Sequence, residues 1–342
     1  MRERIEHISV YEVFLCMFVI LIHVLSEGVS GFTRGTLPSA LFFCTSRLVS
    51  FAVPAFIFTS GMKLCMKFRN SKLNYPVFLW GRIKKIYLPY LLWAVIYYLF
   101  CVYRLHYFDF NLTDLMKYLL NGEISAQFYF VLVIMQFYLL MPLCLPLCRK
   151  CNPVLLLPLG GIVTIAAKIL LTGWVYNDRI FVCYLVFWLV GCAAGLKGAQ
   201  SLHAWLKRYQ LLIYLGWLIF SSLHVGLQHL NYCEKIAYPY PEPLMVLFSL
   251  CSILGFYLLI EKLTHRLSPW LKKFFQQVSG ASYYIFLVHC LVLLAVNQVL
   301  DHFAIASLSV RFLLRTPTVY LLSILLCVAY TNGKRFIFGK RS

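Results

Sequence analysis

The chain has 342 residues, of which 61% are hydrophobic and 13% are charged, and its formal net charge is +19. A soluble domain carries about 25% charged residues, so this composition excludes a soluble globular protein. The apolar runs have the length of membrane-spanning helices. They indicate an all-α, polytopic transmembrane helix bundle and exclude an outer-membrane β-barrel.

The positive charge does not point to a nucleic-acid partner. Lys and Arg lie mainly between the apolar runs, where they set membrane orientation and attract anionic lipids. The chain contains no DNA- or RNA-binding motif, no Walker lysine loop, no G-x-S-x-G elbow and no His-Glu-x-x-His pair. We therefore expect membrane lipids as partners, no nucleic acid, no bound cofactor and no metal.

The 13 cysteines raise the question of a disulfide or metal framework. Most of them lie within or beside apolar runs, where a free cysteine behaves as a small hydrophobic residue. Cys148 and Cys151 form a C-x-x-C pair, but no second pair with zinc-ligand spacing accompanies it. The cysteines are therefore expected to pack as apolar side chains.

Ten apolar runs reach the roughly 20 residues that a bilayer-crossing helix needs. They lie at 8–27, 39–62, 84–103, 128–148, 153–173, 180–198, 209–230, 244–263, 281–300 and 316–333. An even number of spans places both termini on one side. Most of the 31 Lys and Arg residues fall on that side, including Arg2, Arg4, Arg335, Lys340 and Arg341. This bias predicts cytoplasmic termini, and we expect a single transmembrane domain over residues 1–342.

The first run, 8–27, carries an acidic residue and an imidazole, Glu12 and His23. Eleven residues at about 100° each complete about three turns, so both side chains lie on one helix face, about 16 Å apart. An ionisable group in hydrocarbon is costly unless it faces a bundle interior or a wet cavity. This helix is therefore expected to line a polar interior.

The other polar residues within predicted spans are few: Gln136, Lys168, His224, His289 and Asn297. Each either lines the interior or makes a helix-packing hydrogen bond, and both interpretations stay open for His289. His23 has the stronger functional case, because a neutral imidazole near the outer mouth can take a proton from a hydroxyl. Lys168 is expected to snorkel or to pair with an acidic group.

Several stretches carry a family resemblance. The first span ends in VILIH at His23, and FAVPAFIFTSGMKL, RIKKIYLPYLLW, FYFVLVIMQFYLLMPL and GASYYIFLVH follow at 51–64, 82–93, 128–143 and 280–289. In this order the stretches resemble the acyltransferase-3 family of ten-helix bacterial membrane proteins. The likeness is strongest to the branch that contains the polysaccharide intercellular adhesin export and O-acylation protein.

The resemblance implies a membrane-bound O-acyltransferase in the bacterial cell membrane. Such an enzyme moves an acyl group, usually acetyl from acetyl-CoA on the cytoplasmic side, to a glycan hydroxyl at or beyond the outer face. By this likeness His23 is the catalytic residue, and we expect it to act as general base. The glycan acceptor and polysaccharide synthase components are the implied partners.

The remaining site residues follow from that interpretation. Arg82, Lys84 and Lys85 would attract the phosphates of acyl-CoA, and Ser60, Gln136 and His289 would line the acyl path. Two positions depart from the family pattern: Glu12 replaces an arginine, and Gln127 replaces a histidine that the branch often has. Both are expected beside the same interior. Glu12 is expected to pair with Arg82, Lys84, Lys85 or Lys168, or to reach the cytoplasmic headgroups.

Two other functions remain open from the sequence. The same interior could move a polysaccharide or lipid-linked sugar without forming a bond, or the chain could be a non-catalytic partner of a polysaccharide synthase. Binding and hydrolysis of acetyl-CoA by the purified protein would separate these possibilities.

Overall fold

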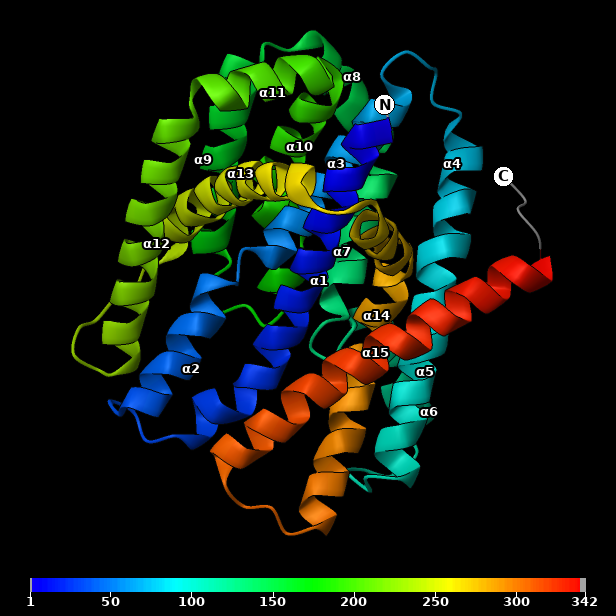
Figure 1. Ribbon diagram of the computed structural model, residues 1–342, viewed down its shortest axis with the longest axis vertical. Coiled ribbons are helices and arrows are strands. Elements are labelled where there is room, and N and C mark those ends of the chain that lie inside the picture. The colour runs from blue at the N-terminus through cyan, green and yellow to red at the C-terminus, as the bar shows by residue number, and fades with distance from the viewer. Residues whose placement is uncertain (1, 339–342) are drawn as a thin grey trace. The chain divides into compact units, whose positions relative to one another are not determined.

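The computed structural model describes residues 2–338, together with the side chains of residues 6–198, 201–334 and 336. Throughout this part of the chain the structure is helical and contains no β-strand (Figure 1). Within it, eight helices are long and apolar enough to cross a membrane, or up to ten if each of two bent helix pairs counts as one span. The chain is therefore an all-α, multi-pass membrane protein, as its composition predicts.

The ten predicted runs coincide with these elements. The unbent candidate spans are Glu6–Gly31, Leu37–Phe68, Tyr75–Tyr103, Pro153–Leu170, Gln210–Tyr232, Glu242–Arg266, Pro269–His302 and Leu308–Lys334. The bent pairs are Tyr129–Leu139 with Met141–Lys150, at 63°, and Phe181–Lys197 with Ser201–Arg208, at 118°. The candidate spans therefore agree with the sequence in order, and they agree in number where each bent pair counts as one span.

The chain forms two compact units, Met1–Phe56 with His203–Ser342, and Ile57–Leu202. We call them the first and the second unit. The expectation of one domain stays a prediction.

The first unit is built around α1 (Arg2–Gly31), which packs against four other helices of that unit. These are α2 (Leu37–Leu48), α13 (Glu242–Arg266), α14 (Pro269–His302) and α15 (Leu308–Phe338). Figure 1 shows α15 crossing α14 and α1 obliquely. A sixth helix, α12 (Gln210–Tyr232), packs against α2 and α13. The surroundings of α1 explain why Val10, Tyr11, Leu15 and Val24 are fully buried.

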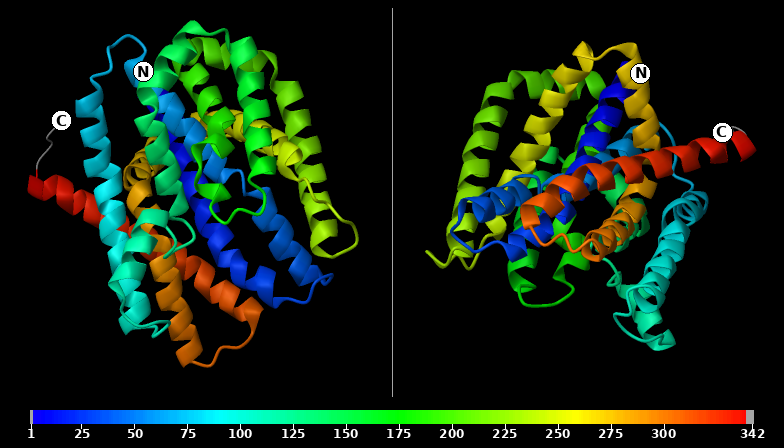
Figure 2. Two further views of the ribbon diagram at one scale, coloured as in Figure 1. Left: turned by 180° about the vertical axis from the view of Figure 1, so that it is seen from behind. Right: turned by 60° about the horizontal axis from the view of Figure 1, so that its bottom comes forward.

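The second unit contains the rest of α3 (Ala52–Phe68), which begins in the first unit. It continues with α4 (Tyr75–Arg82), the π-helical turn η1 (Ile83–Tyr87), α5 (Leu88–Tyr103), α6 (Leu112–Asn121), α7 (Tyr129–Leu139) and α8 (Met141–Lys150). It ends with α9 (Pro153–Leu170), the 3₁₀ turns η2 (Asn177–Arg179) and η3 (Phe181–Tyr184), and α10 (Leu185–Lys197). The view from behind in Figure 2 shows α4 and α5 as one long helix. Then α11 (Ala199–Arg208) links the two units.

Two glycines allow α10 to pack closely on α3. A Cβ at Gly191 would lie 2.1 Å from the carbonyl oxygen of Phe58, and one at Gly195 would lie 2.4 Å from that of Met62. Both contacts are with backbone and cannot relax by a change of rotamer. The pair is thus a small-residue helix contact of the kind that membrane bundles use.

The structure places three arginines, Arg47, Arg311 and Arg315, within candidate spans. Arg47 lies at the last turn of α2, within the candidate span Leu37–Phe68. Arg311 and Arg315 lie within the span Leu308–Lys334, because α15 begins before the predicted run. The terminal residues used to predict orientation fall outside the described side chains: Arg2, Arg4, Arg335, Lys340 and Arg341.

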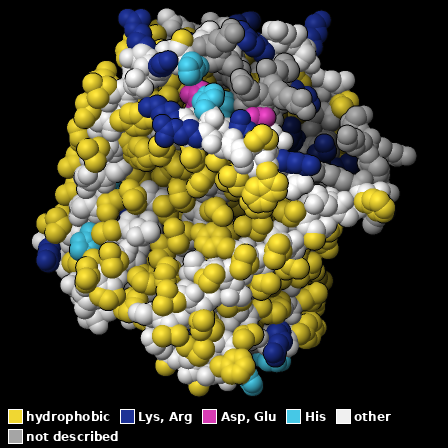
Figure 3. Space-filling model, viewed as in Figure 1, with side chains coloured by type: hydrophobic (Ala, Val, Ile, Leu, Met, Phe, Trp, Pro, Cys, Tyr) yellow, Lys and Arg dark blue, Asp and Glu magenta, His cyan; other side chains and the backbone are white. Residues whose placement is uncertain are grey.

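The surface has the composition expected of a lipid-facing protein. Figure 3 shows hydrophobic side chains covering most of one face, with Lys, Arg and His side chains gathered toward its ends. Individual residues agree, since four leucines are each more than 60% exposed: Leu212, Leu218, Leu313 and Leu325, at 65%, 65%, 68% and 62%. Hydrocarbon can cover such side chains as a protein interior would.

Candidate active site

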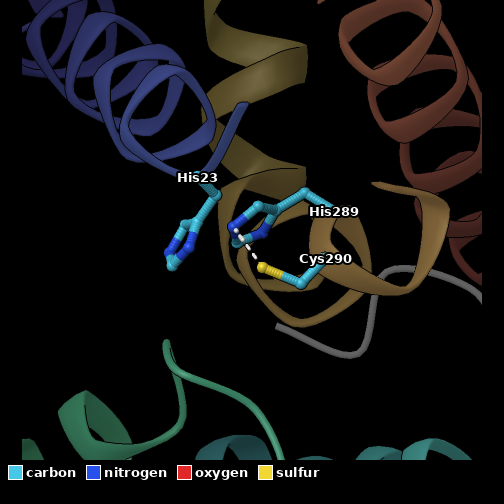
Figure 4. A group of neighbouring side chains, drawn as sticks. All are labelled: His23, His289 and Cys290. Atoms are coloured by element: carbon cyan, nitrogen blue, oxygen red, sulfur yellow. Dashed lines mark hydrogen bonds between the residues drawn. The ribbon is translucent and has the colours of Figure 1, made fainter. Parts of the chain in front are cut away.

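Two histidines from distant parts of the sequence meet in the first unit. His23 lies about two turns before the end of α1, and His289 lies on α14, which packs along α1. The ring centroids are 5.1 Å apart and the ring planes make an angle of 51° (Figure 4). His289 is completely buried, whereas His23 is half-buried. The sequence singled out both residues but did not predict their contact.

The ring of His289 is held in one orientation. Its Nδ1 lies 3.1 Å from the carbonyl oxygen of Ile285, one turn earlier on α14. A carbonyl can only accept, so Nδ1 carries the proton and donates it, and Nε2 of the neutral ring is an acceptor. This Nε2 lies 3.3 Å from Sγ of Cys290, whose thiol can donate. One neutral tautomer satisfies both hydrogen bonds.

Cys290 completes a compact group of donor atoms. A ring nitrogen of His23, one of His289 and Sγ of Cys290 all lie within 4.8 Å of one another. Imidazole and thiolate are ligands that zinc and copper accept, and a backbone carbonyl on the far nitrogen is a common support for a ligating histidine. The expectation of no metal stays a prediction.

Near the C-terminal end of α1, Glu27 binds two arginines of α15. Its carboxylate accepts from Nη1 of Arg315 and lies 2.8 Å from Nε of Arg311. Arg315, only 2% exposed, also donates to the carbonyl oxygen of Val24 at 2.5 Å and to Oδ1 of Asn297 at 3.1 Å. These contacts join the C-terminal parts of α1 and α14 to the first turns of α15, one turn beyond His23.

Toward the other end of α1, the Glu12 side chain is buried and accepts a hydrogen bond from Oγ of Ser279 at 3.0 Å. Ser279 lies on α14, as His289 does. The four cationic partners considered for Glu12 all belong to the second unit, so that pairing stays a prediction. Glu12 thus connects α1 to α14 about three helical turns before His23.

The second unit holds Gln136 through both ends of its amide. Nε2 donates to the carbonyl oxygen of Arg179 at 2.7 Å, and Oε1 accepts from the backbone N–H of Phe181 at 3.0 Å. The side chain thereby fastens α7 to the segment between η2 and η3. This is the packing hydrogen bond that the sequence left open as an alternative, and a role in lining the acyl path stays a prediction.

Gln127 and Ser60 also make hydrogen bonds within the second unit. Gln127, 2% exposed, donates to the hydroxyl of Tyr97 at 3.1 Å and accepts from that of Ser125 at 2.6 Å. The hydroxyls of Ser60 and Tyr138 lie 3.2 Å apart and join α3 to α7. Contact of these groups with a substrate stays a prediction.

The basic residues assigned to acyl-CoA lie around the π-helical turn η1. The guanidinium of Arg82 lies over the rings of Phe78 and Tyr138, at 5.2 Å and 5.1 Å from their centroids. Such cation–π contacts fix the direction of a guanidinium. Lys84 and Lys85 belong to η1 itself and are exposed. These ammonium groups are therefore available to an anionic ligand.

Comparison with known proteins identifies one relationship. A family model described as an acyltransferase domain matches residues 9–332, and therefore nearly the whole chain, including His23 and His289. No protein with a curated description and no solved structure matches the chain.

Proposed function

The chain belongs to the acyltransferase-3 family, and we propose that this membrane acyltransferase moves an acetyl group from acetyl-CoA to a hydroxyl of a cell-surface or exported polysaccharide. The donor would bind at the cytoplasmic face of a bacterial cell membrane and the acceptor at the outer face. Acetyl-CoA, the glycan and the branch of the family rest on the resemblance of the motifs around His23, Ser60, Arg82, Gln136 and His289.

The observation that carries the proposal is the pair of imidazoles in the first unit. Acyl transfer to a hydroxyl needs a base that removes the hydroxyl proton as the new bond forms. His23 is suited to this role because it is half-buried and so can meet a substrate, while His289 behind it is fully buried. Within its own unit, the described structure has no hydrogen bond to a ring nitrogen of His23. The ring is therefore available to an acceptor hydroxyl.

The donor site is assigned to the basic residues around η1. Acyl-CoA carries several phosphate charges, and Lys84 and Lys85 are exposed where an anion can reach them. The guanidinium of Arg82 lies over two aromatic rings, which fix its direction. We assign phosphate binding to these three side chains.

Exposed aromatic residues support a sugar as acceptor. Trp174 is 46% exposed and meets Tyr176 edge to face, with ring centroids 5.7 Å apart. In the first unit Tyr240 is 60% exposed. Flat aromatic faces with a polar edge suit the apolar faces of sugar rings. We assign these residues to the outer side, which holds the acceptor.

This orientation, with both termini in the cytoplasm, has its own test. A membrane-impermeant thiol reagent applied to intact cells should label an Asp109→Cys variant. Residue 109 lies between the third and fourth predicted spans, and this segment is outside the cell if both termini are cytoplasmic. The reagent should not label a Ser342→Cys variant unless the cells are opened, and the parent protein measures the background from its own cysteines. The reverse pattern would contradict the proposed orientation and the sidedness of the reaction.

The function is tested with purified protein in lipid vesicles, acetyl-CoA labelled in its acetyl group, and polysaccharide from the producing strain. We expect the label to move to the polysaccharide, and His23→Ala to abolish the transfer. Movement of polysaccharide across the vesicle membrane without labelling would instead show an exporter. Binding of acetyl-CoA without turnover would indicate a non-catalytic partner of a synthase.

A further inference from the structure

Cys290 and His289 have the geometry of a nucleophile and its base. The thiol sulfur lies 3.3 Å from Nε2 of the imidazole, within the distance over which a thiol donates a hydrogen bond to a nitrogen. A thiol reacts as its thiolate, so a nucleophilic cysteine needs a neighbouring group that takes its proton. In Figure 4 the sulfur and the His289 ring are joined by the hydrogen bond that such a transfer would follow.

A third group orients the base, as in known nucleophile–base pairs. The carbonyl oxygen of Ile285 accepts from Nδ1 of His289 at 3.1 Å, which leaves Nε2 as the acceptor for the thiol. When Nε2 takes the proton, the imidazolium keeps this hydrogen bond, and the carbonyl dipole favours its charge. The backbone of α14 thus does for His289 what a carboxylate does in other triads.

His23 supplies a second base from another helix. Its ring nitrogen lies within 4.8 Å of both the Cys290 sulfur and a nitrogen of His289. One imidazole is on the cysteine's own helix, α14, and the other is on α1 and half-buried. Two bases beside one nucleophile suit a reaction with two proton transfers, one for each partner of the acyl group.

We propose that Cys290 accepts the acyl group as a thioester and passes it to the acceptor hydroxyl, so that the reaction has a covalent acyl-enzyme intermediate. This inference rests on the proposed function, because it takes an acyl-CoA as donor and a glycan hydroxyl as acceptor. It assigns a chemical role to a side chain that an apolar context would otherwise explain as packing.

In the first step His289 Nε2 takes the thiol proton while the sulfur attacks the carbonyl carbon of the donor thioester. The tetrahedral intermediate collapses with cleavage of the bond between that carbon and the sulfur of CoA. The leaving thiolate takes the proton from His289 and departs as the free thiol. One thioester is consumed and one is formed, so the step needs no oxidant and no other reactant.

In the second step His23 takes the proton of the acceptor hydroxyl while its oxygen attacks the carbonyl carbon on Cys290. The bond from that carbon to the Cys290 sulfur breaks, and the cysteine thiolate recovers a proton from His23. The products are the acyl ester and the original thiol. Each imidazole ends the cycle in the neutral state in which it began.

Burial of the cluster suits an intermediate that water would destroy. Cys290 is 7% exposed and His289 is 0% exposed, so an acyl thioester at this position is shielded from hydrolysis on the side of α14. The ring of His23 is half-buried, and we expect an acceptor to approach the cluster from the side of this ring. A covalent carrier also lets the donor leave before the acceptor binds, so the two need not occupy the site together.

The test starts from a His23→Ala variant, which lacks the base for the second step. Purified His23→Ala protein in detergent is mixed with acetyl-CoA, and its intact mass is measured. We expect a gain of one acetyl group that neutral hydroxylamine removes, located by peptide mapping at Cys290. The gain should be absent in a His23→Ala, Cys290→Ala double variant and present when Cys327→Ala replaces the second change. Cys327 is a buried cysteine of α15 and serves as the matched control.

Steady-state measurements on the otherwise unchanged protein give a second readout. We expect Cys290→Ala to lower transfer about 10²-fold or more, Cys327→Ala to leave it within about twofold, and the wild-type protein to follow ping-pong kinetics. The inference is wrong if an active wild-type protein gives no acetylated Cys290 in the His23→Ala background. It is also wrong if Cys290→Ala keeps transfer within about twofold, or if the purified protein holds one equivalent of a metal ion on these three side chains. A wild-type protein without transfer would overturn the proposed function instead.

Discussion

The two units use buried polar groups in opposite ways. In the second unit both ends of the Gln136 amide are bound to backbone atoms, and Gln127 is held between two hydroxyls. In the first unit the polar groups of the candidate site face one another. His23 and His289 lie ring against ring, and the thiol of Cys290 points at Nε2 of His289.

The difference separates groups that hold helices together from groups that can exchange protons. An amide does not titrate in the physiological range, so a buried glutamine with both ends bound can fix a connection but cannot act as acid or base. An imidazole and a thiol can do both. Substitutions of the two glutamines should therefore lower stability, and those among the three side chains of the first unit should lower the rate.

The largest effect is expected for His23→Ala. Removing a positioned base should reduce kcat/KM about 10²- to 10⁴-fold, with little change in the melting temperature because the ring is half-buried. Acetyl transfer and thermal melts in detergent measure the two quantities. The matched control is His224→Ala, which removes a buried imidazole that stacks on Phe248 at 4.5 Å. This control should lower the melting temperature with little change in kcat/KM, and activity of His23→Ala within about twofold of wild type would contradict the comparison.

A smaller effect, on stability alone, is expected for Gln136→Leu. The change leaves the carbonyl of Arg179 and the N–H of Phe181 without their partner, and a buried polar group without a partner costs about 1–3 kcal/mol. Thermal melts should show a lower midpoint, while kcat/KM of the folded protein stays within about threefold. Gln136→Glu keeps the acceptor for the Phe181 N–H, so its melting temperature should lie between those of the wild-type protein and Gln136→Leu. A loss of rate without a loss of stability would place Gln136 among the reacting groups.

The smallest effect is expected for Ser60→Ala, which removes one hydrogen bond to Tyr138. A single neutral hydrogen bond contributes about 0.5–1.5 kcal/mol. Tyr138→Phe should cost a similar amount, and the double variant should cost less than the two single changes together, because both remove the same contact. Denaturation midpoints of the four proteins measure this coupling. A Ser60→Ala variant that is stable but inactive would move Ser60 to the acyl path.

The sequence was sufficient to predict the helical spans, because a bilayer-crossing helix needs an apolar run of fixed length. Helix ends were less accurate. Although the ninth run was predicted at 281–300, α14 begins at Pro269. Its first turns are amphipathic and capped by Ser268, so a hydropathy average excludes them. In the same way the early turns of α15, with Arg311 and Arg315, lie before the run predicted at 316–333.

The candidate site could be predicted only in part. An imidazole in an apolar run is unusual by itself, which is why His23 and His289 could be selected from the sequence. Their contact depends on how α1 packs along α14, and no local pattern determines that. The position of Cys290 beside the two imidazoles was not predicted, because a cysteine among apolar residues looks like a packing residue. Its position directly after a buried histidine was the available signal.

The π-helical turn at Ile83–Tyr87 bears on how this chain can tolerate insertions and deletions. Such a turn holds one residue more than the α-helical turn in its place, so α4 is rotated about 100° relative to a continuous α-helix with α5. Losing one residue there would restore regular α-helix without breaking the span. The rotation would, however, carry Arg82 away from the Tyr138 ring while leaving it over Phe78 on its own helix. In this segment a change in residue number redirects a charge, whereas in most loops it alters only length.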